Sequence, residues 1–193
     1  MKLVKIQEKL KKVQNERRYE HTLGVAYTAT CLAYRYGEDP EKARLAGLLH
    51  DCAKHLSGEK ALEMCAKYDL PVNNIEKNNP FLLHGKVGAL IAQKKFNVDD
   101  EDILNAITYH TTGRPGMSLL EKIIYVSDYI EPNRDFASNL DTVRNLAFEN
   151  LDMALMKILE DILKHLLDKN LPTDPMTQKT FDYYIKEQLI NGK

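Results

Sequence analysis

Apolar residues recur along most of the chain at spacings of three and four residues, which is the pattern of an amphipathic helix. The widest stripe runs from Leu151 to Leu166, inside a segment that is predicted to be helical from Thr142 to Lys169. Other helices are predicted over residues 5–14, 20–36, 40–51, 59–67, 84–95, 99–110 and 118–130, with a last one that ends near 190. The sequence therefore predicts an all-α fold.

The predicted helices begin and end at residues that suit those positions. Gly37 follows one long helix, and Asp39 with Pro40 suits the start of the next. Ser118 and Glu121 form a capping box. The intervening loops, at residues 69–80, 111–116, 131–139 and 171–175, are too short to separate domains. Residues 1–193 are therefore predicted to form one domain that ends in a helical extension.

Composition excludes several classes of protein. Lys and Arg number 27 and Asp and Glu 28, so the net charge of -1 argues against nucleic-acid binding and against a polybasic membrane-surface protein. No apolar run reaches the roughly 18 residues of a membrane span, and charges interrupt the first ten residues, which excludes a signal peptide. Three cysteines without paired spacing favour a reduced, cytoplasmic setting.

Several polar residues stand where core residues are expected. His50 shares a predicted helix face with Ala46 and Leu49. Asp128 follows Ile124 by four residues, on a stripe where a bare carboxylate is costly. One such histidine alone is usually a satisfied core residue, but a whole set on different helices points to a shared metal site. The set is His21, His50, Asp51, His84, His110 and Asp128. Imidazole and carboxylate ligands without thiolate suit iron, manganese, cobalt, nickel or zinc better than magnesium.

The series of residues resembles the HD-domain superfamily of metal-dependent phosphohydrolases, whose core is a His…His-Asp…Asp set on a helical bundle. Five short sequence motifs resemble one branch of this superfamily, the YqeK family, more closely. They are HTLGVA at 21–26, AGLLHDCAK at 46–54, HGKVGA at 84–89, YHTTGR at 109–114 and SDYIEPNR at 127–134. The resemblance implies an HD-domain bundle and a hydrolase that splits diadenosine tetraphosphate symmetrically into two ADP. It also implies an iron-type centre of one or two ions, with cobalt, manganese or zinc as alternatives.

The resemblance also implies roles for single residues. The principal metal ligands would be His21, His50, Asp51 and Asp128. His84 and His110 match positions that either hold a second metal or contact phosphates, and with two metals Asp51 would bridge them.

The residues suggest a hypothesis for the chemistry. No Ser-His-Asp or Cys-His arrangement supplies a protein nucleophile, so we expect in-line attack by metal-bound hydroxide on an inner phosphorus. Asp51 and Lys54 are the expected catalytic residues, because Lys54 lies one helical turn after His50. Lys54, Arg134 and Thr111 are expected to bind phosphates, together with His84, His110 and Asp128.

Two other functions remain open at this stage. The first is another HD-type phosphohydrolase, acting on a deoxynucleotide, a guanosine polyphosphate or a cyclic dinucleotide. The second is an HD module that senses a nucleotide without turnover. A nucleotide is the expected small-molecule partner, and a homodimer stays open. Residues 170–175 are interpreted as a connection between helices, with a cover over the adenine as the alternative.

Overall fold

The computed structural model describes residues 3–135 and 139–191, and the side chains up to residue 189. Within these ranges the chain is helical without strands, as predicted. The α-helices are α1 (Leu3–Val13), α2 (Glu16–Tyr36), α3 (Pro40–Leu49), α4 (Gly58–Lys67), α5 (Asn74–Asn78), α6 (His84–Phe96), α7 (Glu101–Tyr109), α8 (Leu119–Ile130), α9 (Leu140–Glu149), α10 (Leu151–Asp168) and α11 (Pro175–Asn191), with a 3₁₀ helix η1 at Pro80–Leu83.

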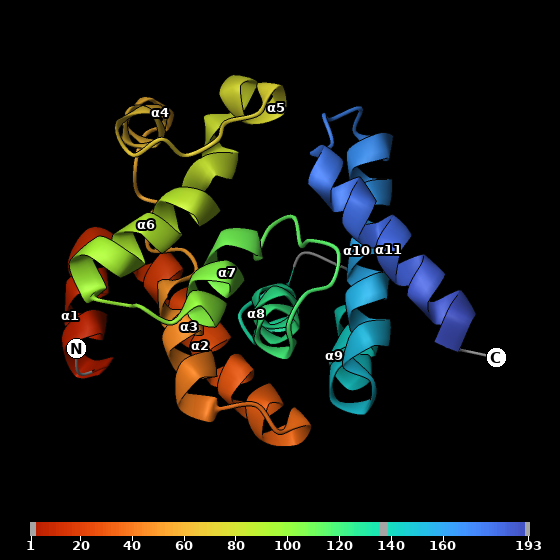
Figure 1. Cartoon of the computed structure of the whole chain (residues 1–193). Helices are drawn as coiled ribbons and strands as arrows, with labels where there is room; N and C mark the ends of the chain where they lie inside the picture. Colours follow the sequence, from red (N-terminus) through yellow and green to blue (C-terminus); the bar gives the residue numbers. More distant parts are fainter. Residues whose placement is uncertain (1–2, 136–138, 192–193) are drawn as a thin grey trace.

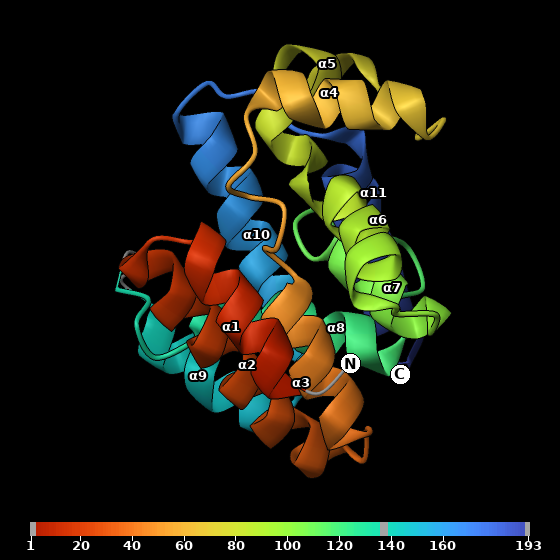
Figure 2. The same ribbon diagram turned by 90° about the vertical axis from the view of Figure 1, so that its left-hand side faces the viewer.

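Helix α8 lies near the middle of the bundle (Figure 1). It packs against α2, α3 and α7 on one side and against α9 and α10 on the other. Helices α4, α5 and η1 form an arm at one end of α6 (Figures 1 and 2). One cluster of buried apolar residues extends from Ile6 in α1 to Tyr184 in α11. No helix in the described ranges has both the length and the apolar character of a membrane span.

The predicted caps are present. Gly37 ends α2 in the left-handed conformation, with φ at 77°. The Asp39 side chain accepts from the Glu41 amide at 2.8 Å, and Ser118 and Glu121 form the reciprocal capping box. These local signals were readable because each cap joins residues only two to four positions apart.

Four predicted boundaries were wrong. Helix α2 begins at Glu16 rather than residue 20, because the Asn15 side chain caps the Arg18 amide at 2.9 Å. The segment 69–80, interpreted as a loop with one short turn, contains the five-residue helix α5, and η1 begins at its last residue. The helix expected from Thr142 to Lys169 is two helices, because Asn150 has extended backbone and its side chain caps the Met153 amide. Helix α3 ends at Leu49, so Asp51 is not helical.

Two further predictions concern segments that the structure tests incompletely. The break expected at 131–139 is seen at its described ends, and residues 136–138 lie outside the described residues. In the 170–175 segment, Asp174 caps the start of α11 and accepts from the Asn73 amide group at 3.1 Å, which ties this segment to the start of α5. The single domain over 1–193 and the adenine cover stay predictions.

Candidate metal centre

Three histidines directly follow the last residue of a helix. Helices α3, η1 and α7 end immediately before His50, His84 and His110. In each case Nδ1 contacts the carbonyl oxygen three residues back, at 2.7 Å for Gly47, 2.6 Å for Phe81 and 2.7 Å for Ile107. The last carbonyls of a helix have no partner within the helix, and each imidazole contacts one of them; the Phe81 carbonyl also accepts from the His84 backbone amide. At Gly47 this contact takes the place of the bond from the Asp51 amide that would continue α3.

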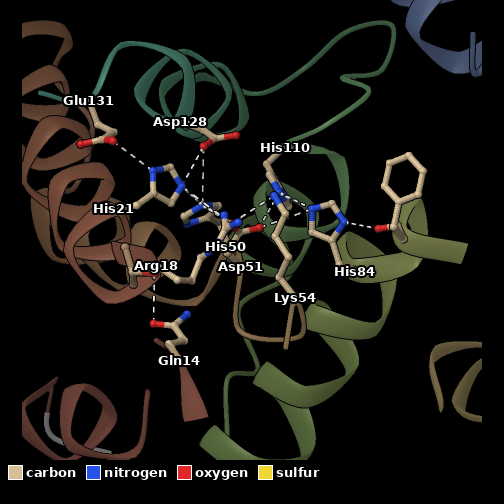
Figure 3. A network of polar contacts seen from close by, with 12 residues as sticks. Gln14, Arg18, His21, His50, Asp51, Lys54, His84, His110, Asp128 and Glu131 are labelled. Carbon is tan, nitrogen blue, oxygen red and sulfur yellow. Dashed lines mark hydrogen bonds and ion pairs between the residues drawn. The ribbon is translucent and has the colours of Figure 1, made fainter. Parts of the chain in front are cut away.

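These contacts determine which ring nitrogen faces the site. A carbonyl oxygen only accepts hydrogen bonds, so Nδ1 of each ring carries the proton and donates it. In the neutral ring, Nε2 then presents a lone pair. The side chains of His50, His84 and His110 are at most 5% exposed, and their Nε2 atoms face the region around Asp51 (Figure 3).

His21 is held differently, because it lies within α2 and not at a helix end. Its Nδ1 contacts Glu131 Oε1 at 3.1 Å, and Glu131 Oε2 accepts from the Asn133 amide at 2.8 Å. Glu131 is 1% exposed. Gly24, one turn after His21, leaves space for this carboxylate, since a Cβ there would collide with Glu131 Oε2. A carboxylate therefore orients this histidine, whereas carbonyls orient the other three.

A first group of donor atoms comes from α2, the turn after α3, and α8. His21 Nε2 lies 3.1 Å from Asp128 Oδ1 and 3.2 Å from His50 Nε2. Asp51 Oδ2 lies 3.7 Å from His21 Nε2 and 3.5 Å from His50 Nε2. We call His21, His50, Asp51 and Asp128 the first cluster.

A second group lies on the other side of the same aspartate. His84 Nε2 and His110 Nε2 are 3.1 Å apart, and Asp51 Oδ1 lies 3.4 Å from the first and 3.5 Å from the second. We call Asp51, His84 and His110 the second cluster. Asp51 Oδ1 is buried, and no hydrogen bond reaches it from the described residues. A buried carboxylate oxygen without a donor is costly, so this atom and the facing lone pairs fit a cation.

Comparison with known proteins agrees with this geometry. A model of the HD domain family matches residues 18–133, which contain every member of both clusters. The chain belongs to the HD domain family. The match begins in the first turn of α2 and ends just after α8, so α9, α10 and α11 follow the HD domain.

Several relatives match nearly the whole chain. It is 45% identical over 176 residues to a Bacillus subtilis protein named symmetrical bis(5'-nucleosyl)-tetraphosphatase, covering 91% of this chain and 94% of the relative. A Staphylococcus aureus protein of the same name is 36% identical, with 95% of each chain covered. A crystal structure described as a predicted HD superfamily hydrolase involved in NAD metabolism from Clostridium acetobutylicum is 46% identical, covers 97% of this chain and 98% of its own, and has a TM-score of 0.94.

The HD domain brings together all six residues that the sequence singled out. The possible ligand atoms fall into three overlapping groups whose members lie within 4.8 Å of one another: His21 with His50 and Asp51, His50 with His110 and Asp128, and Asp51 with His84 and His110. Imidazole and carboxylate donors in this arrangement can bind a divalent metal ion.

The HD domain holds its carboxylates ionised. Burial alone would raise the pKa of Asp51, but His50, His110 and Lys54 outweigh it and hold the pKa well below its usual range. The pKa of Asp128 is likewise lowered, because His21, His50 and Arg134 outweigh burial. Both side chains are therefore in the state that binds cations.

The histidines differ in their affinity for protons. Burial, together with the facing His110 and Lys54, lowers the pKa of His84 to about 3, so this ring is neutral near pH 7. For His50, burial lowers the pKa, but Asp51 and Asp128 outweigh it and the pKa lies above its ordinary value. A proton therefore competes with a cation for His50 and not for His84.

Three cationic side chains surround the clusters. Lys54 Nζ lies 3.2 Å from Asp51 Oδ2, and Arg134 Nη2 lies 2.7 Å from Asp128 Oδ1, so both stand where the sequence placed them. Arg18 Nη1 lies 2.7 Å from Asp51 Oδ2, which sequence reasoning missed. Thr111 follows His110 on a half-exposed turn, and no described contact joins it to either cluster.

Sequence reasoning also missed Glu131 as the partner of His21. Glu131 lies in the sequence motif at 127–134, but it follows the end of α8 and so occupies no periodic apolar position. Arg18 stands three residues before His21, and this helical spacing is the one signal that could have placed it beside the site.

Proposed function

We propose that this chain is a metal-dependent hydrolase that splits diadenosine tetraphosphate symmetrically into two ADP. The observation that carries the proposal is Asp51, whose two oxygens face two separate sets of imidazole Nε2 atoms. Such a pair of sites suits phosphoryl chemistry, in which two cations can stabilise the attacking and leaving oxygens. The names of the Bacillus and Staphylococcus relatives supply the substrate class, a bis(5'-nucleosyl) tetraphosphate cleaved symmetrically, and adenosine as the nucleoside follows from the family resemblance.

The first cluster would hold one cation through His21, His50, Asp51 and Asp128. We assign His84 and His110 to a second cation, and not to direct phosphate contact. Their Nδ1 protons are used by carbonyls, and a histidine ring in this tautomer, when neutral, has no Nε2 proton to donate to a phosphate oxygen. A bound divalent metal supplies a Lewis acid and lowers the pKa of a coordinated water from about 15.7 towards about 7.

The donor set supports iron, with cobalt, manganese or zinc as alternatives. Imidazole ligands suit these metals, and no thiolate stands in either cluster. Cys52 follows Asp51 in the chain, but burial raises its pKa to about 12 and its Sγ contacts the Gly88 carbonyl at 3.4 Å. This thiol is therefore not available as a ligand or nucleophile.

Positive side chains meet the phosphates of the substrate. Lys54 and Arg134 each contact a cluster carboxylate and are about 30% exposed, so each can also reach a phosphate oxygen. Lys54 would offset the negative charge that develops on the oxygens of the reacting phosphorus. The hydroxyl of Thr111, the residue after His110, would donate a hydrogen bond to a phosphate oxygen. In the reaction, a water oxygen bonds to one inner phosphorus, and the bond to the bridging oxygen breaks. One ADP leaves and the other carries the new oxygen.

The test begins with chelator-treated protein that is reloaded under anaerobic conditions with iron, cobalt, manganese or zinc. Each sample receives diadenosine tetraphosphate, a guanosine polyphosphate, a deoxynucleoside triphosphate and a cyclic dinucleotide, and products are separated by chromatography. We expect turnover of the first substrate with ADP as the sole adenine product, and none in the Asp51→Asn variant. Preference for another substrate would assign a different HD activity, and binding without turnover would indicate a nucleotide sensor.

A further inference from the structure

A pocket of about 420 Å³ opens beside the first cluster, between the start of α2 and the turn after α8. His21 lines its wall, so the pocket is continuous with the first cluster. Figure 3 shows two other wall residues, Arg18 and Glu131, on opposite sides of His21. We call it the arginine pocket, because three guanidinium groups line it: Arg17 and Arg18 from α2, and Arg134 from the turn.

The charge of the arginine pocket is positive on balance. Two acidic residues line the pocket. The carboxylate of Glu131 is buried, and its two oxygens contact His21 Nδ1 and the Asn133 amide. Asp135 is exposed and is the second acidic residue. Arg17 is exposed, and Arg18 and Arg134 are partly exposed. Within the lining, three guanidinium groups therefore face one accessible carboxylate, while Arg18 and Arg134 also contact Asp51 and Asp128 of the first cluster. An anion becomes the favoured occupant once a cation neutralises those two carboxylates.

Two of these arginines contact oxygens that the first cluster also uses. Arg18 Nη1 lies 2.7 Å from Asp51 Oδ2, and Arg134 Nη2 lies 2.7 Å from Asp128 Oδ1. A divalent cation on these oxygens would neutralise both carboxylates, which leaves guanidinium charge for a further anion. Planar guanidinium groups bind phosphate oxygens in a bidentate manner, so a phosphate that also reaches the first cluster is the matching ligand.

The lining residues Arg18 and His21 lie on one side of Asp51, whereas His84 and His110 of the second cluster lie on the other side (Figure 3). A tetraphosphate that is cut in its middle has two equal diphosphate halves, and each half needs positive partners. The volume is at the lower end of the roughly 300–1,000 Å³ typical of small-molecule sites, which suits a diphosphate with part of its nucleoside. We propose that Arg17 and Arg18, together with Arg134, bind the diphosphate of one ADP half. This proposal rests on the proposed function.

The experiment uses ADP, the expected product, as the probe on metal-loaded protein. Binding is measured by calorimetry for the wild type, Arg17→Gln, Arg18→Gln and, as a matched loss of one exposed charge on α11, Lys179→Gln. Each arginine variant is expected to weaken ADP binding about tenfold and to raise KM for diadenosine tetraphosphate with little change in kcat. Metal affinity, measured separately, is expected to stay unchanged in Arg17→Gln and in the control. In Arg18→Gln it is expected not to fall, because the lost cation faces the carboxylate of Asp51.

Three results would overturn the subsite. One is unchanged ADP affinity and KM in both arginine variants. Another is a loss in Arg18→Gln that tracks weaker metal binding while Arg17→Gln has no effect, since Arg18 would then act only through Asp51. The third is an equal loss in Lys179→Gln. If the wild type binds ADP through these arginines but hydrolyses no diadenosine tetraphosphate, the subsite stands and the proposed function fails.

Discussion

Glu131 Oε1 lies 3.1 Å from His21 Nδ1, and this carboxylate contact has no counterpart at His50, His84 or His110, whose Nδ1 atoms contact carbonyls. An ionised carboxylate makes an imidazole a stronger ligand than a carbonyl does, and it also fixes the direction of the ring. If His21 binds a cation as proposed, it is the histidine whose binding we expect to depend on a neighbouring carboxylate.

Replacing Glu131 by Gln should weaken metal binding about 10- to 100-fold, because the amide keeps the shape and removes the charge. Competition with a chromophoric chelator measures this directly. Glu63→Gln, an exposed change on α4, serves as the control. Gly24→Ala should act in the same direction, since its methyl group would displace the carboxylate. Wild-type metal affinity in Glu131→Gln would show that the contact does not support the ligand.

The bridging position of Asp51 predicts how many ions each variant binds. The wild type should bind two ions per chain, His84→Gln one and Asp51→Asn none, because Asp51 presents one carboxylate oxygen to each of the two clusters. Elemental analysis after gel filtration gives these numbers, and His165→Gln on the exposed side of α10 is the control. Two ions in His84→Gln would contradict the second cluster and return His84 to a phosphate contact.

Stability of the chelator-treated protein should fall as pH decreases from about 6.5 towards 4. The pKa of His84 is about 3 in the folded chain and about 6.5 when unfolded, so the unfolded chain binds more protons in this window. Asp51 and Asp128, with lowered pKa values, lose their contribution only below about pH 4. Urea unfolding at several pH values should show a shallower fall for His84→Gln. Equal slopes for variant and wild type would contradict a buried neutral ring.

Arg114 is the last residue of the sequence motif at 109–114, but it should support the stability of the fold and not substrate binding. Its guanidinium contacts Glu121 through two bonds of 2.6 and 2.8 Å, and Glu121 is 1% exposed. Arg114→Ala should therefore lower the free energy of unfolding by about 2 kcal/mol, because it leaves a buried carboxylate without its cation. Lys157→Ala, which removes two solvent-accessible pairs with Glu160 and Asp161, should cost less than about 1 kcal/mol. A loss of ADP affinity in Arg114→Ala would place this residue at the substrate.

Much of the fold was predictable because its signals are local. Helix periodicity and the caps at Asp39 and Ser118 all act within one turn of chain. The errors arose where a competing local contact is invisible in the pattern. The apolar stripe continues across Asn150, yet the side chain of Asn150 caps a new helix and divides it. The His50 ring contacts the Gly47 carbonyl, which the Asp51 amide would bind in a longer helix, and α3 ends before Asp51.

The candidate site was predictable in its residues and not in its supporting contacts. Six ionisable residues stood out at positions expected to be buried, since burial of such groups demands a shared reason. Five of them are buried, and Asp128 is partly buried. Arg18 and Glu131 are charged residues that resemble ordinary solvated positions in sequence. Their partners lie 33 and 110 residues away, and only the fold joins them. Sequence patterns of short period carry no information on such pairings.

The most direct test is hydrolysis of diadenosine tetraphosphate by metal-loaded protein in water enriched in ¹⁸O, with products analysed by mass spectrometry. Attack of water on an inner phosphorus predicts ADP as the only nucleotide product, with half of the molecules carrying a single ¹⁸O on the β-phosphate. Formation of ATP and AMP, or ADP without the label, would contradict symmetrical hydrolysis at this metal centre.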